Sequence, residues 1–306
     1  MNALIIGYGS IGKRHARILD QLGLNIAVAS RRQVDHPNCF PDIQQALDIW
    51  NPEYIVISSQ THEHYRDFSI LAEAGFAGVV LIEKPLFHEP RAIPENIFSR
   101  AYVAFNLRFH PVLKTLRAIV NGKKKIAAHS YVGQYLPKWR PKQDYRLGYS
   151  ADRNRGGGVL RDLSHELDYL TWMLGKWQKV AALGGQFSHL QINSDDVYSI
   201  LFKTNDCPIA SLALNYLDDS LHRDVVIFTE DGTARANFVS GTVSFREKEE
   251  LQINVDIDTT YLAQHKAVLQ RDETALCNLD AGLGVSQLIN AIETANQTGV
   301  WVELRD

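Results

Sequence analysis

Long apolar stretches are absent from this chain of 306 residues. No run approaches the roughly 20 apolar residues that a membrane-spanning helix needs. The opening MNALIIGYGS also lacks the basic start and long apolar stretch of a secretory signal peptide, so we expect none. We therefore expect no membrane partner.

Cysteine and excess positive charge are also scarce. The three cysteines, Cys39, Cys207 and Cys277, are odd in number and far apart, which favours free thiols in a reducing cytoplasm. The 32 Lys and Arg residues are outnumbered by 35 Asp and Glu, so we expect no nucleic-acid partner. His62 and His64 are two positions apart with no third ligand nearby, and we expect no metal site.

What the chain does have is the composition of a globular protein, 45% hydrophobic and 22% charged, long enough for two domains. In its first third, short apolar segments alternate with segments of helical pattern. The expected strands are 3–6, 25–29, 54–58 and 79–82, and the expected helices are 13–22, 41–47 and 64–74. This alternation predicts a doubly wound parallel sheet, with ligands bound beyond the carboxyl ends of its strands.

The segment GYGSIG follows the first strand and precedes the first helix. Gly7 permits a tight turn, Gly9 lets the backbone approach a pyrophosphate, and Gly12 lets helix and strand pack closely. The phosphates would then lie on the free N–H groups of the helix. The alternative is a plain strand-to-helix turn. The expected dinucleotide contacts in this loop are Gly7, Tyr8, Gly9, Ser10, Ile11 and Gly12.

The end of the second strand bears on the choice between NAD and NADP. An acidic residue that bonds the 2′-hydroxyl of NAD is normal there, but this chain has Ser30, Arg31 and Arg32. Because arginine pairs with a 2′-phosphate, we expect NADP to be preferred over NAD. The alternative is that both arginines are merely exposed loop residues.

The segment GGGVLRDLSHELDYLTWMLG, residues 156–175, is expected to form one helix after its glycines. An apolar stripe on it consists of Leu160, Leu163, Leu167, Leu170 and Leu174. On the opposite side lie Asp162, His165 and Tyr169, followed by Trp172. The aromatic residues favour a second covered surface such as a cleft wall. The alternative is that Asp162 and His165 are ordinary surface residues.

The segments GYGSIGKRH, THEHY, EKPL and GGGVLRDLSHELD together resemble the glucose–fructose oxidoreductase / inositol dehydrogenase / MocA (Gfo/Idh/MocA) family over essentially the whole chain. The resemblance implies an α/β protein. A Rossmann domain (1–118) would be joined to an α+β substrate-binding domain (119–306) with a large, mostly antiparallel open sheet. It also implies NAD(P)-dependent oxidation or reduction of a sugar or cyclitol carbon. NLRFHP and GQYLPKWRPKQDYRLGY look like members associated with nucleotide-sugar and surface-saccharide biosynthesis.

The resemblance also implies site residues. The catalytic set is Lys84, Asp162 and His165. Further cofactor contacts are Ser59, Gln60, His64, Glu83 and Lys84, added to the glycine loop and to Ser30, Arg31 and Arg32. Candidate substrate contacts are Arg108, Trp139, Arg140, Tyr145 and His165, with Asp144 and Arg146 beside them. A mixture of arginine and aromatic side chains suits a sugar that carries phosphate or carboxylate. The alternative for each of the arginine, aromatic and aspartate residues is a packed or solvated loop residue.

This chain departs from the family pattern in three places. Its aspartate and histidine are three residues apart instead of four, although both spacings share a helix face. The usual T-P-x-H reads SQTH at 59–62. Pro90 and Pro94 lie where the family often has a longer helix.

Carbinol oxidation removes an O–H proton as hydride leaves the carbon. An imidazole, which titrates near ~6.5 in model peptides, can exchange that proton at neutral pH. We expect His165 to do so, with Asp162 orienting its ring, while Lys84 bonds the same oxygen. Whether Lys84 or His165 carries the proton is open from the sequence. So are the substrate and the direction of reaction.

From about residue 126 the pattern changes to strands that alternate apolar and polar residues, as in an antiparallel sheet with one wet face. The expected strands are 128–134, 180–188, 197–203, 209–216, 225–229, 233–238, 242–245, 251–257 and 300–304, with a hairpin turn at 230–233. The expected helices are 261–269 and 281–298, the latter capped by Asp280. An uncovered apolar face predicts a homodimer or homotetramer, and Ile200, Ile209, Leu212 and Val226 could fill its interface.

Two other functions compete with this one. A non-catalytic NAD(P)-binding regulator could keep the glycines, but it tends to lose the polar set of Lys84, Asp162 and His165. A methyltransferase could use the glycine loop for another adenosine ligand, but the EKP segment has no role there. Fold alone does not decide between them.

Overall fold

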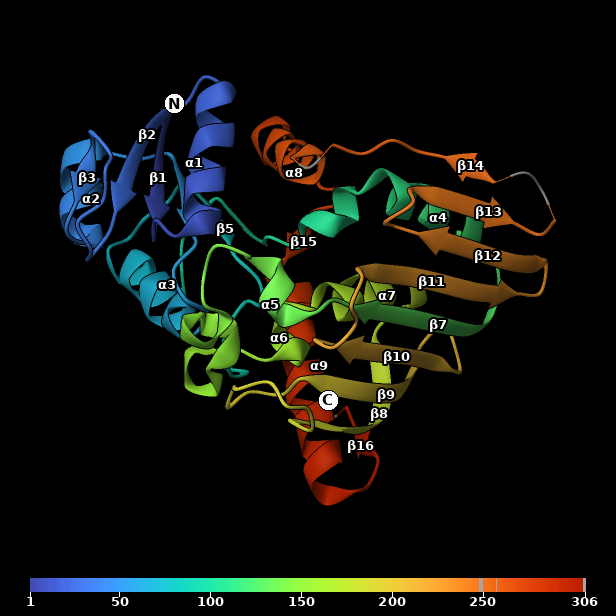
Figure 1. The fold of residues 1–306 in the computed structure, drawn as a ribbon. Coiled ribbons are helices and arrows are strands. Elements are labelled where there is room, and N and C mark those ends of the chain that lie inside the picture. Colours follow the sequence, from blue (N-terminus) through green and yellow to red (C-terminus); the bar gives the residue numbers. More distant parts are fainter. Residues whose placement is uncertain (248–249, 257, 305–306) are drawn as a thin grey trace. The chain divides into compact units, whose positions relative to one another are not determined.

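The computed structural model describes residues 1–247, 250–256 and 258–304 (Figure 1). Contacts between residues divide the chain into two compact units. The first comprises Met1–Asn106 and Thr260–Ser286, and the second comprises Leu107–Thr259 and Gln287–Asp306. The expected division into 1–118 and 119–306 differs in two ways. It cuts through helix α4 (Pro111–Val120), and it omits the return of the chain to the first unit.

The first unit contains a seven-stranded sheet of Rossmann type, in the order β15-β6-β5-β4-β1-β2-β3. All neighbouring strands are parallel except β15, which runs antiparallel to β6. The strands are β1 (Asn2–Ile6), β2 (Asn25–Ala29), β3 (Cys39–Phe40), β4 (Tyr54–Ile57), β5 (Val79–Ile82), β6 (Arg100–Val103) and β15 (Cys277–Asn278). The four predicted strands are confirmed. They form the middle of the sheet, where nearly every side chain is buried.

The helices of the first unit lie close to where the sequence predicts them. They are α1 (Ser10–Gln21), α2 (Ile43–Trp50), α3 (His64–Glu73), preceded by the 3₁₀ turn η1 (Thr61–Glu63), and α8 (Thr259–Gln270), whose first residue belongs to the second unit. Helix α2 begins two residues later than predicted, because the Asp42 side chain accepts the N–H of Gln45 at 2.9 Å and caps it. Residues 83–99 form no helix, in line with Pro90 and Pro94.

The second unit contains a nine-stranded sheet in the order β14-β13-β12-β11-β7-β10-β9-β8-β16 (Figure 1). Its strands are β7 (Lys125–Gly133), β8 (Trp177–Gly185), β9 (Val197–Thr204), β10 (Ala210–Asn215), β11 (His222–Thr229), β12 (Gly232–Asn237), β13 (Thr242–Phe245), β14 (Leu251–Gln252) and β16 (Val302–Glu303). Only β7 and β10 pair in parallel, so the predicted, mostly antiparallel sheet is confirmed. The predicted strand 251–257 is wrong beyond Gln252 over the described residues, and its last residue, 257, lies outside them.

Burial alternates along these strands. On β9, for example, Tyr198, Ile200 and Phe202 are buried, whereas Ser199 and Leu201 are exposed. Helices α4, α6 (Val159–Asp162) and α7 (His165–Leu174) contact this sheet. The other side chains, including Leu201 and Val226, form what we call the open face.

Two of the four interface residues expected from the sequence are therefore misplaced. Ile200 and Leu212 are only 3% and 2% exposed and belong to the buried set. Ile209, which is exposed, precedes β10, and half-buried Val226 belongs to the open face. Period-two alternation identifies both faces of a strand but does not say which one the helices cover.

The predicted single helix over the glycine-rich segment is wrong, because it breaks into α6 and α7. At the break, the N–H groups of Ser164 and Glu166 bond the carbonyls of Arg161 and Leu163, three residues back, which tightens the chain. All five leucines of the stripe are still buried. Asp162 and His165 consequently lie on different helices.

The last long helix, α9 (Leu279–Thr298), begins with a different cap from the predicted one. The N–H of Ala281 donates to the Asn278 side chain at 2.9 Å, so Asn278 and not Asp280 caps it. Asp280 lies inside the first turn, where its charge favours the helix dipole. The remaining short elements are η2 (Asn106–Phe109), α5 (Leu136–Trp139), η3 (Tyr145–Leu147), η4 (Tyr149–Ala151) and η5 (Arg153–Arg155).

Within the described parts of the chain, no helix is both long enough and apolar enough to cross a bilayer. The same residues contain no group of three or more His, Cys, Asp or Glu side chains arranged to hold a metal ion. The three cysteines are free thiols.

Candidate active site

The surroundings of the three glycines in the first loop fit a bound dinucleotide. Gly7 has φ +87°, and a Cβ there would lie 2.6 Å from the Ser59 nitrogen. A Cβ on Gly12 would lie 2.1 Å from the Gly7 carbonyl oxygen. By contrast, a Cβ on Gly9 would meet nothing within 4 Å, so there is open space beside the backbone where a pyrophosphate would approach.

Helix α1 begins directly after this loop. Gly9 is its N-cap residue and provides no side-chain hydrogen bond, which leaves the first N–H groups of the helix for an anionic ligand. Beside the loop, the Tyr8 ring packs edge-to-face on His36, with 5.6 Å between the ring centroids. The Lys13 ammonium lies 5.5 Å from the centroid of the Tyr8 ring. The residues present thus fit a bound diphosphate.

The Ser30-Arg31-Arg32 turn is tied to η1. The Ser30 hydroxyl accepts the N–H of Arg32 at 3.2 Å, and the Arg31 guanidinium donates to the Glu63 carboxylate. Both arginines are exposed, with 62% of the Arg31 side chain accessible. A ligand phosphate would therefore compete with Glu63 for Arg31.

His64 was expected to contact the cofactor, but it is 1% exposed and both of its ring nitrogens face backbone carbonyls. Its Nδ1 lies 3.0 Å from the Pro85 oxygen, and its Nε2 lies 3.1 Å from the Ser59 oxygen. Burial lowers the pKa of His64, despite the carbonyls that favour its charged form. This geometry argues that His64 connects the loop after β4 to the EKP segment instead of touching a ligand. Ser59 and Gln60 themselves are half-buried at the end of β4.

Glu83 and Lys84 follow β5 at the carboxyl edge of the sheet. Glu83 is 9% exposed; its Oε2 accepts the N–H of Lys84 at 3.1 Å, and its Oε1 lies 2.9 Å from His15 Nε2. Burial alone would raise the pKa of Glu83, but the hydrogen bond with His15 and the charge of Lys84 lower it overall. Glu83 is accordingly a carboxylate at neutral pH, beside the half-buried Lys84.

In the second unit, Asp162 is held by two tyrosine hydroxyls. Tyr216 donates to its Oδ2 at 2.6 Å, and Tyr149 donates to its Oδ1. Asp162 is 6% exposed, and Tyr216 is fully buried. Burial and the Asp162 charge raise the pKa of both hydroxyls well above 10, so both remain protonated donors.

His165 opens α7 and is half-buried, three residues after Asp162. Trp139 packs edge-to-face against Tyr216 at 5.2 Å, and Arg140 is exposed immediately after it. The structure thus places Trp139 next to the tyrosine that holds Asp162.

Arg108 was expected to contact substrate, but it is only 4% exposed. Its guanidinium forms a bidentate ion pair with Asp168, with Nη2 to Oδ1 at 2.6 Å and Nε to Oδ2 at 2.9 Å. It also lies 5.1 Å from the Trp172 ring. This environment argues for a structural role, since a buried ion pair is expensive to break.

The remaining expected contacts lie on the segment after α5. Tyr145 is half-buried, and its hydroxyl accepts the N–H of Gln191 at 3.3 Å. Arg146 donates to both oxygens of Asp144 and to Gln191, all on the surface. Tyr149, which sequence reasoning missed, comes from this same segment. Tyr216 was missed because it is 54 residues from Asp162.

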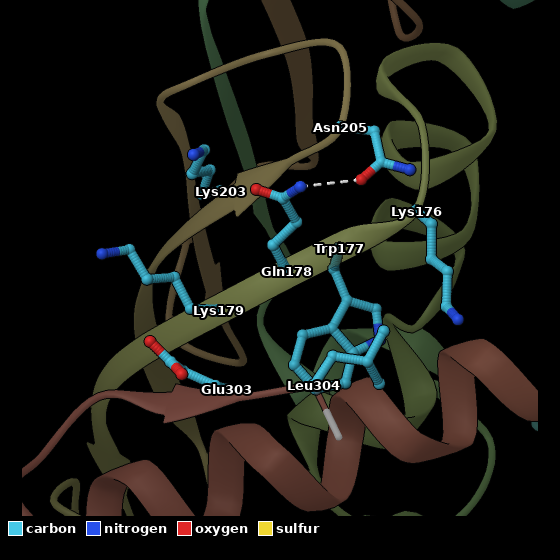
Figure 2. A pocket seen from close by; sticks show the side chains of 8 residues that line it. All are labelled: Lys176, Trp177, Gln178, Lys179, Lys203, Asn205, Glu303 and Leu304. Carbon is cyan, nitrogen blue, oxygen red and sulfur yellow. Dashed lines mark hydrogen bonds between the residues drawn. The ribbon is translucent and has the colours of Figure 1, made fainter. Parts of the chain in front are cut away.

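A hollow of about 530 Å³ lies elsewhere in the second unit, along β8 and β16 (Figure 2). Figure 2 shows the ammonium groups of Lys176, Lys179 and Lys203 pointing apart, while Gln178 donates to Asn205 at 2.9 Å. None of the expected site residues lines it. Without converging groups, it does not have the geometry of a substrate site.

A Rossmann sheet with a glycine loop, followed by a second unit built on a large open sheet, defines the class of two-domain dinucleotide-binding oxidoreductases. Residues 1–97 match the sequence model of the oxidoreductase family with an NAD-binding Rossmann fold, and residues 115–235 match that of the GFO/IDH/MocA C-terminal domain. The chain belongs to the Gfo/Idh/MocA family of NAD-binding oxidoreductases.

Solved structures with the same fold span the whole chain. GenD2 of gentamicin A biosynthesis, in complex with NAD, has 17% identity and a TM-score of 0.83, covering 100% of this chain and 97% of its own. WlbA dehydrogenase from Bordetella pertussis, with NADH and UDP-GlcNAcA, has 19% identity and a TM-score of 0.79, covering 100% and 99%. Levoglucosan dehydrogenase, with NADH and levoglucosan, has 17% identity and a TM-score of 0.82, covering 100% and 99%. Comparison with curated protein sequences gave no match.

Proposed function

We propose that this oxidoreductase transfers hydride between a nicotinamide cofactor and a carbinol or keto carbon of a sugar, nucleotide-sugar or cyclitol. The observation that carries the proposal is the Asp162 carboxylate, which is buried and held by two tyrosine hydroxyls three residues before His165. A carboxylate held in this way can orient an imidazole and stabilise its charged form.

The chain's own residues would hold the cofactor by its diphosphate. The open space beside Gly9 and the uncapped start of α1 fit that group, as do Ser59 and Gln60 at the adjoining strand end. When bound, the nicotinamide accepts or donates the hydride.

Proton transfer at the substrate oxygen falls to His165 in this proposal. As an alcohol is oxidised, His165 accepts the O–H proton, and it returns the proton when a carbonyl is reduced. Lys84 donates a hydrogen bond to the same oxygen and stabilises its developing charge. Glu83, ionised beside Lys84, balances the ammonium charge. The non-catalytic alternative gains no support, since every polar residue of the expected set is present.

A sugar-type substrate is supported by the solved structures, whose bound molecules include UDP-GlcNAcA and levoglucosan. The exposed arginines and half-buried aromatic rings of the segment after α5 suit a sugar that carries phosphate or carboxylate. Arg140, Trp139 and Tyr145 are the contacts we propose.

We propose that the chain prefers NADP over NAD. Arg32 is exposed beside Arg31, and either guanidinium could pair with a 2′-phosphate. The Arg31–Glu63 pair works against this preference because Glu63 already neutralises one of the two charges. We propose that Arg32 makes the first contact with the phosphate.

We also propose a homodimer or homotetramer that covers the open face, where Leu201 is 42% exposed and the Val226 side chain is half-buried. The three free thiols agree with a cytoplasmic location. The composition favours neither a nucleic-acid nor a membrane partner.

Turnover of a panel of sugars tests the proposal. UDP-sugars, levoglucosan and cyclitols would be offered with NADP and NAD, and keto sugars with NADPH and NADH. For the active pair, we expect Lys84→Ala and His165→Ala each to lose about 10²- to 10⁴-fold in kcat while still binding cofactor. Lys114→Ala and His189→Ala serve as controls.

A variant that keeps near-full kcat with the true substrate would remove that residue from the mechanism. If no sugar or cyclitol is turned over in either direction, the proposed substrate class is wrong.

A further inference from the structure

A chain of hydrogen bonds runs through the buried part of the first unit to the EKP segment. It begins at Tyr54 on β4, whose hydroxyl lies 2.9 Å from His265 Nδ1 on α8. His265 Nε2 lies 2.8 Å from His15 Nδ1 on α1, and His15 Nε2 lies 2.9 Å from Glu83 Oε1. Tyr54, His15 and His265 are each 0% exposed. The chain therefore links residues of three elements that are distant in sequence to one carboxylate.

The direction of these bonds depends on the charge of the His15 ring, and a neutral ring gives all of them one direction. Glu83 is a carboxylate and can only accept, so His15 Nε2 carries a hydrogen. In a neutral His15 ring, Nδ1 then accepts, and His265 Nε2 must donate to it. Burial lowers the pKa of His265 well below 6.5, so that ring is neutral and its Nδ1 accepts the Tyr54 hydroxyl hydrogen. With His15 neutral, every donor would point towards Glu83.

The far end of the chain is closed. Tyr54 is the first residue of a buried strand, and burial raises the pKa of its hydroxyl well above 10, although the charge of Arg100 opposes this. A proton entering at Glu83 would find no exit to water at Tyr54. The arrangement consequently suits a fixed support better than a path for protons.

The near end of the chain reaches the proposed catalytic lysine. The second oxygen of Glu83 accepts the Lys84 N–H at 3.1 Å, so the carboxylate that His15 holds also holds the Lys84 backbone. Tyr261 contributes to the same packing, with its ring 5.4 Å from that of His15 and beneath the Arg14 guanidinium.

We infer that His15, His265 and Tyr54 are positioning residues for Glu83 and Lys84, acting by holding both imidazoles in the Nε2–H tautomer. The functional half of this inference rests on the proposed role of Lys84; the tautomer half does not. Sharing a bond direction along several groups makes each bond stronger than it would be alone. The EKP segment is thereby held through Glu83, independently of the contacts that His64 makes with the loop after β4.

The tautomers are tested directly on the full chain labelled with ¹⁵N-histidine, without ligand, at pH 7. Long-range ¹H–¹⁵N spectra identify which ring nitrogen carries hydrogen, and His15→Gln and His265→Phe assign the two signals. We expect both rings to be neutral with hydrogen on Nε2. Hydrogen on Nδ1 of either ring, or on both nitrogens of His15, would overturn the inference.

The positioning role is tested with two variants of one residue, using the sugar and cofactor found active in the panel. His15→Phe keeps a buried ring but removes the donor to Glu83, and we expect kcat to fall about 10- to 100-fold. In His15→Gln the amide can donate from the place of Nε2, so kcat should return to within about threefold of the original chain. NADH affinity, measured by fluorescence, should change by less than about threefold in both.

A smaller change tests the Tyr54 end of the hydrogen-bond chain. Tyr54→Phe removes one buried hydroxyl, and Tyr102→Phe is its control, because Tyr102 donates to Glu273 in the same unit outside the chain. We expect a lower kcat for Tyr54→Phe only. Equal losses in His15→Phe and His15→Gln, or no loss in either, would overturn the positioning role. If these variants behave as expected while Lys84→Ala keeps full turnover, the proposed role of Lys84 fails instead.

Discussion

Removal of one hydroxyl beside Asp162 gives the sharpest test of how the second unit holds its carboxylate. Tyr216 directly follows β10, is 0% exposed and donates to Asp162 at 2.6 Å. Tyr216→Phe keeps the ring that packs against Trp139 but leaves the Asp162 Oδ2 atom without this donor. The change in packing is minimal, so the loss reports the hydrogen bond.

A hydrogen bond to a charged group stabilises a fold by about 1.5 to 3 kcal/mol. At roughly 2.1 cal/mol/K per residue, unfolding a chain of this length has an entropy of about 0.6 kcal/mol/K, so a loss of about 2 kcal/mol lowers Tm by about 3 °C. Tyr131→Phe is the matched control. It removes a tyrosine–aspartate bond of 2.7 Å to Asp218 and the acceptor of an Asn215 bond from the same unit, but Tyr131 is 37% exposed, so the cost should stay below about 0.5 kcal/mol.

The effect of Tyr216→Phe should also depend on pH. Burial and the Asp162 charge raise the pKa of Tyr216 well above 10 in the folded chain, whereas an unfolded tyrosine ionises near ~10. Stability from the protonated hydroxyl is therefore fully present below pH ~10 and is lost as pH rises above it. The stability difference between the original chain and the variant should be constant from about pH 6 to 9 and shrink above pH ~10.

Thermal unfolding followed by circular dichroism over this pH range measures both effects. An equally stable Tyr216→Phe variant would show that water or a neighbouring group replaces the hydroxyl. A stability difference that widens above pH ~10 would refute the assigned direction of the hydrogen bond.

Three further predictions concern other parts of the chain. Changing Arg31 and Arg32 together to serine should weaken NADPH binding at least about tenfold while NADH affinity stays nearly constant, measured by fluorescence titration. Tighter binding of NADH than of NADPH by the original chain would contradict the NADP preference. Light scattering should give at least twice the 34.5 kDa chain mass. Val226→Arg on the open face should lower that mass, whereas the exposed control Ile49→Arg should not. Burial and the charge of Arg223 lower the pKa of His110 to about 4, whereas an unfolded histidine titrates near ~6.5. As pH falls between these values, the unfolded chain binds a proton that the folded chain does not, so stability is lost, and His110→Phe should flatten that loss.

Local patterns in the sequence predicted the local structure well. The run of apolar residues in β1, the three glycines and the start of α1 follow one another within 12 residues, so each conformation depends on its immediate neighbours. The same holds for the hairpin between β11 and β12, where Thr229 pairs with Gly232. Backbone propensity and period decide such features with little tertiary influence.

Contacts between distant residues could not be predicted in this way. The sequence around Asp162 indicates a polar site, but one of its two tyrosine partners, Tyr216, lies 54 residues further on, and His15 meets His265 across 250 residues. The ion pair of Arg108 could not be predicted for the same reason, because its partner Asp168 lies on a separate helix. A polar residue in a sequence does not reveal whether its charge faces a ligand or a buried counter-ion.

The outermost strands of both sheets are the shortest ones. In the first unit these are β3 and β15, in the second β14 and β16, and each has two residues bounded by described residues outside any strand. A two-residue strand offers few unpaired backbone N–H and C=O groups, so a further strand has little to pair with. Neither sheet is therefore a template for growth by strand addition, and fibre-like association through the edges is disfavoured. Copies of this chain that meet must recognise side chains across a face, which makes their association sensitive to single substitutions there.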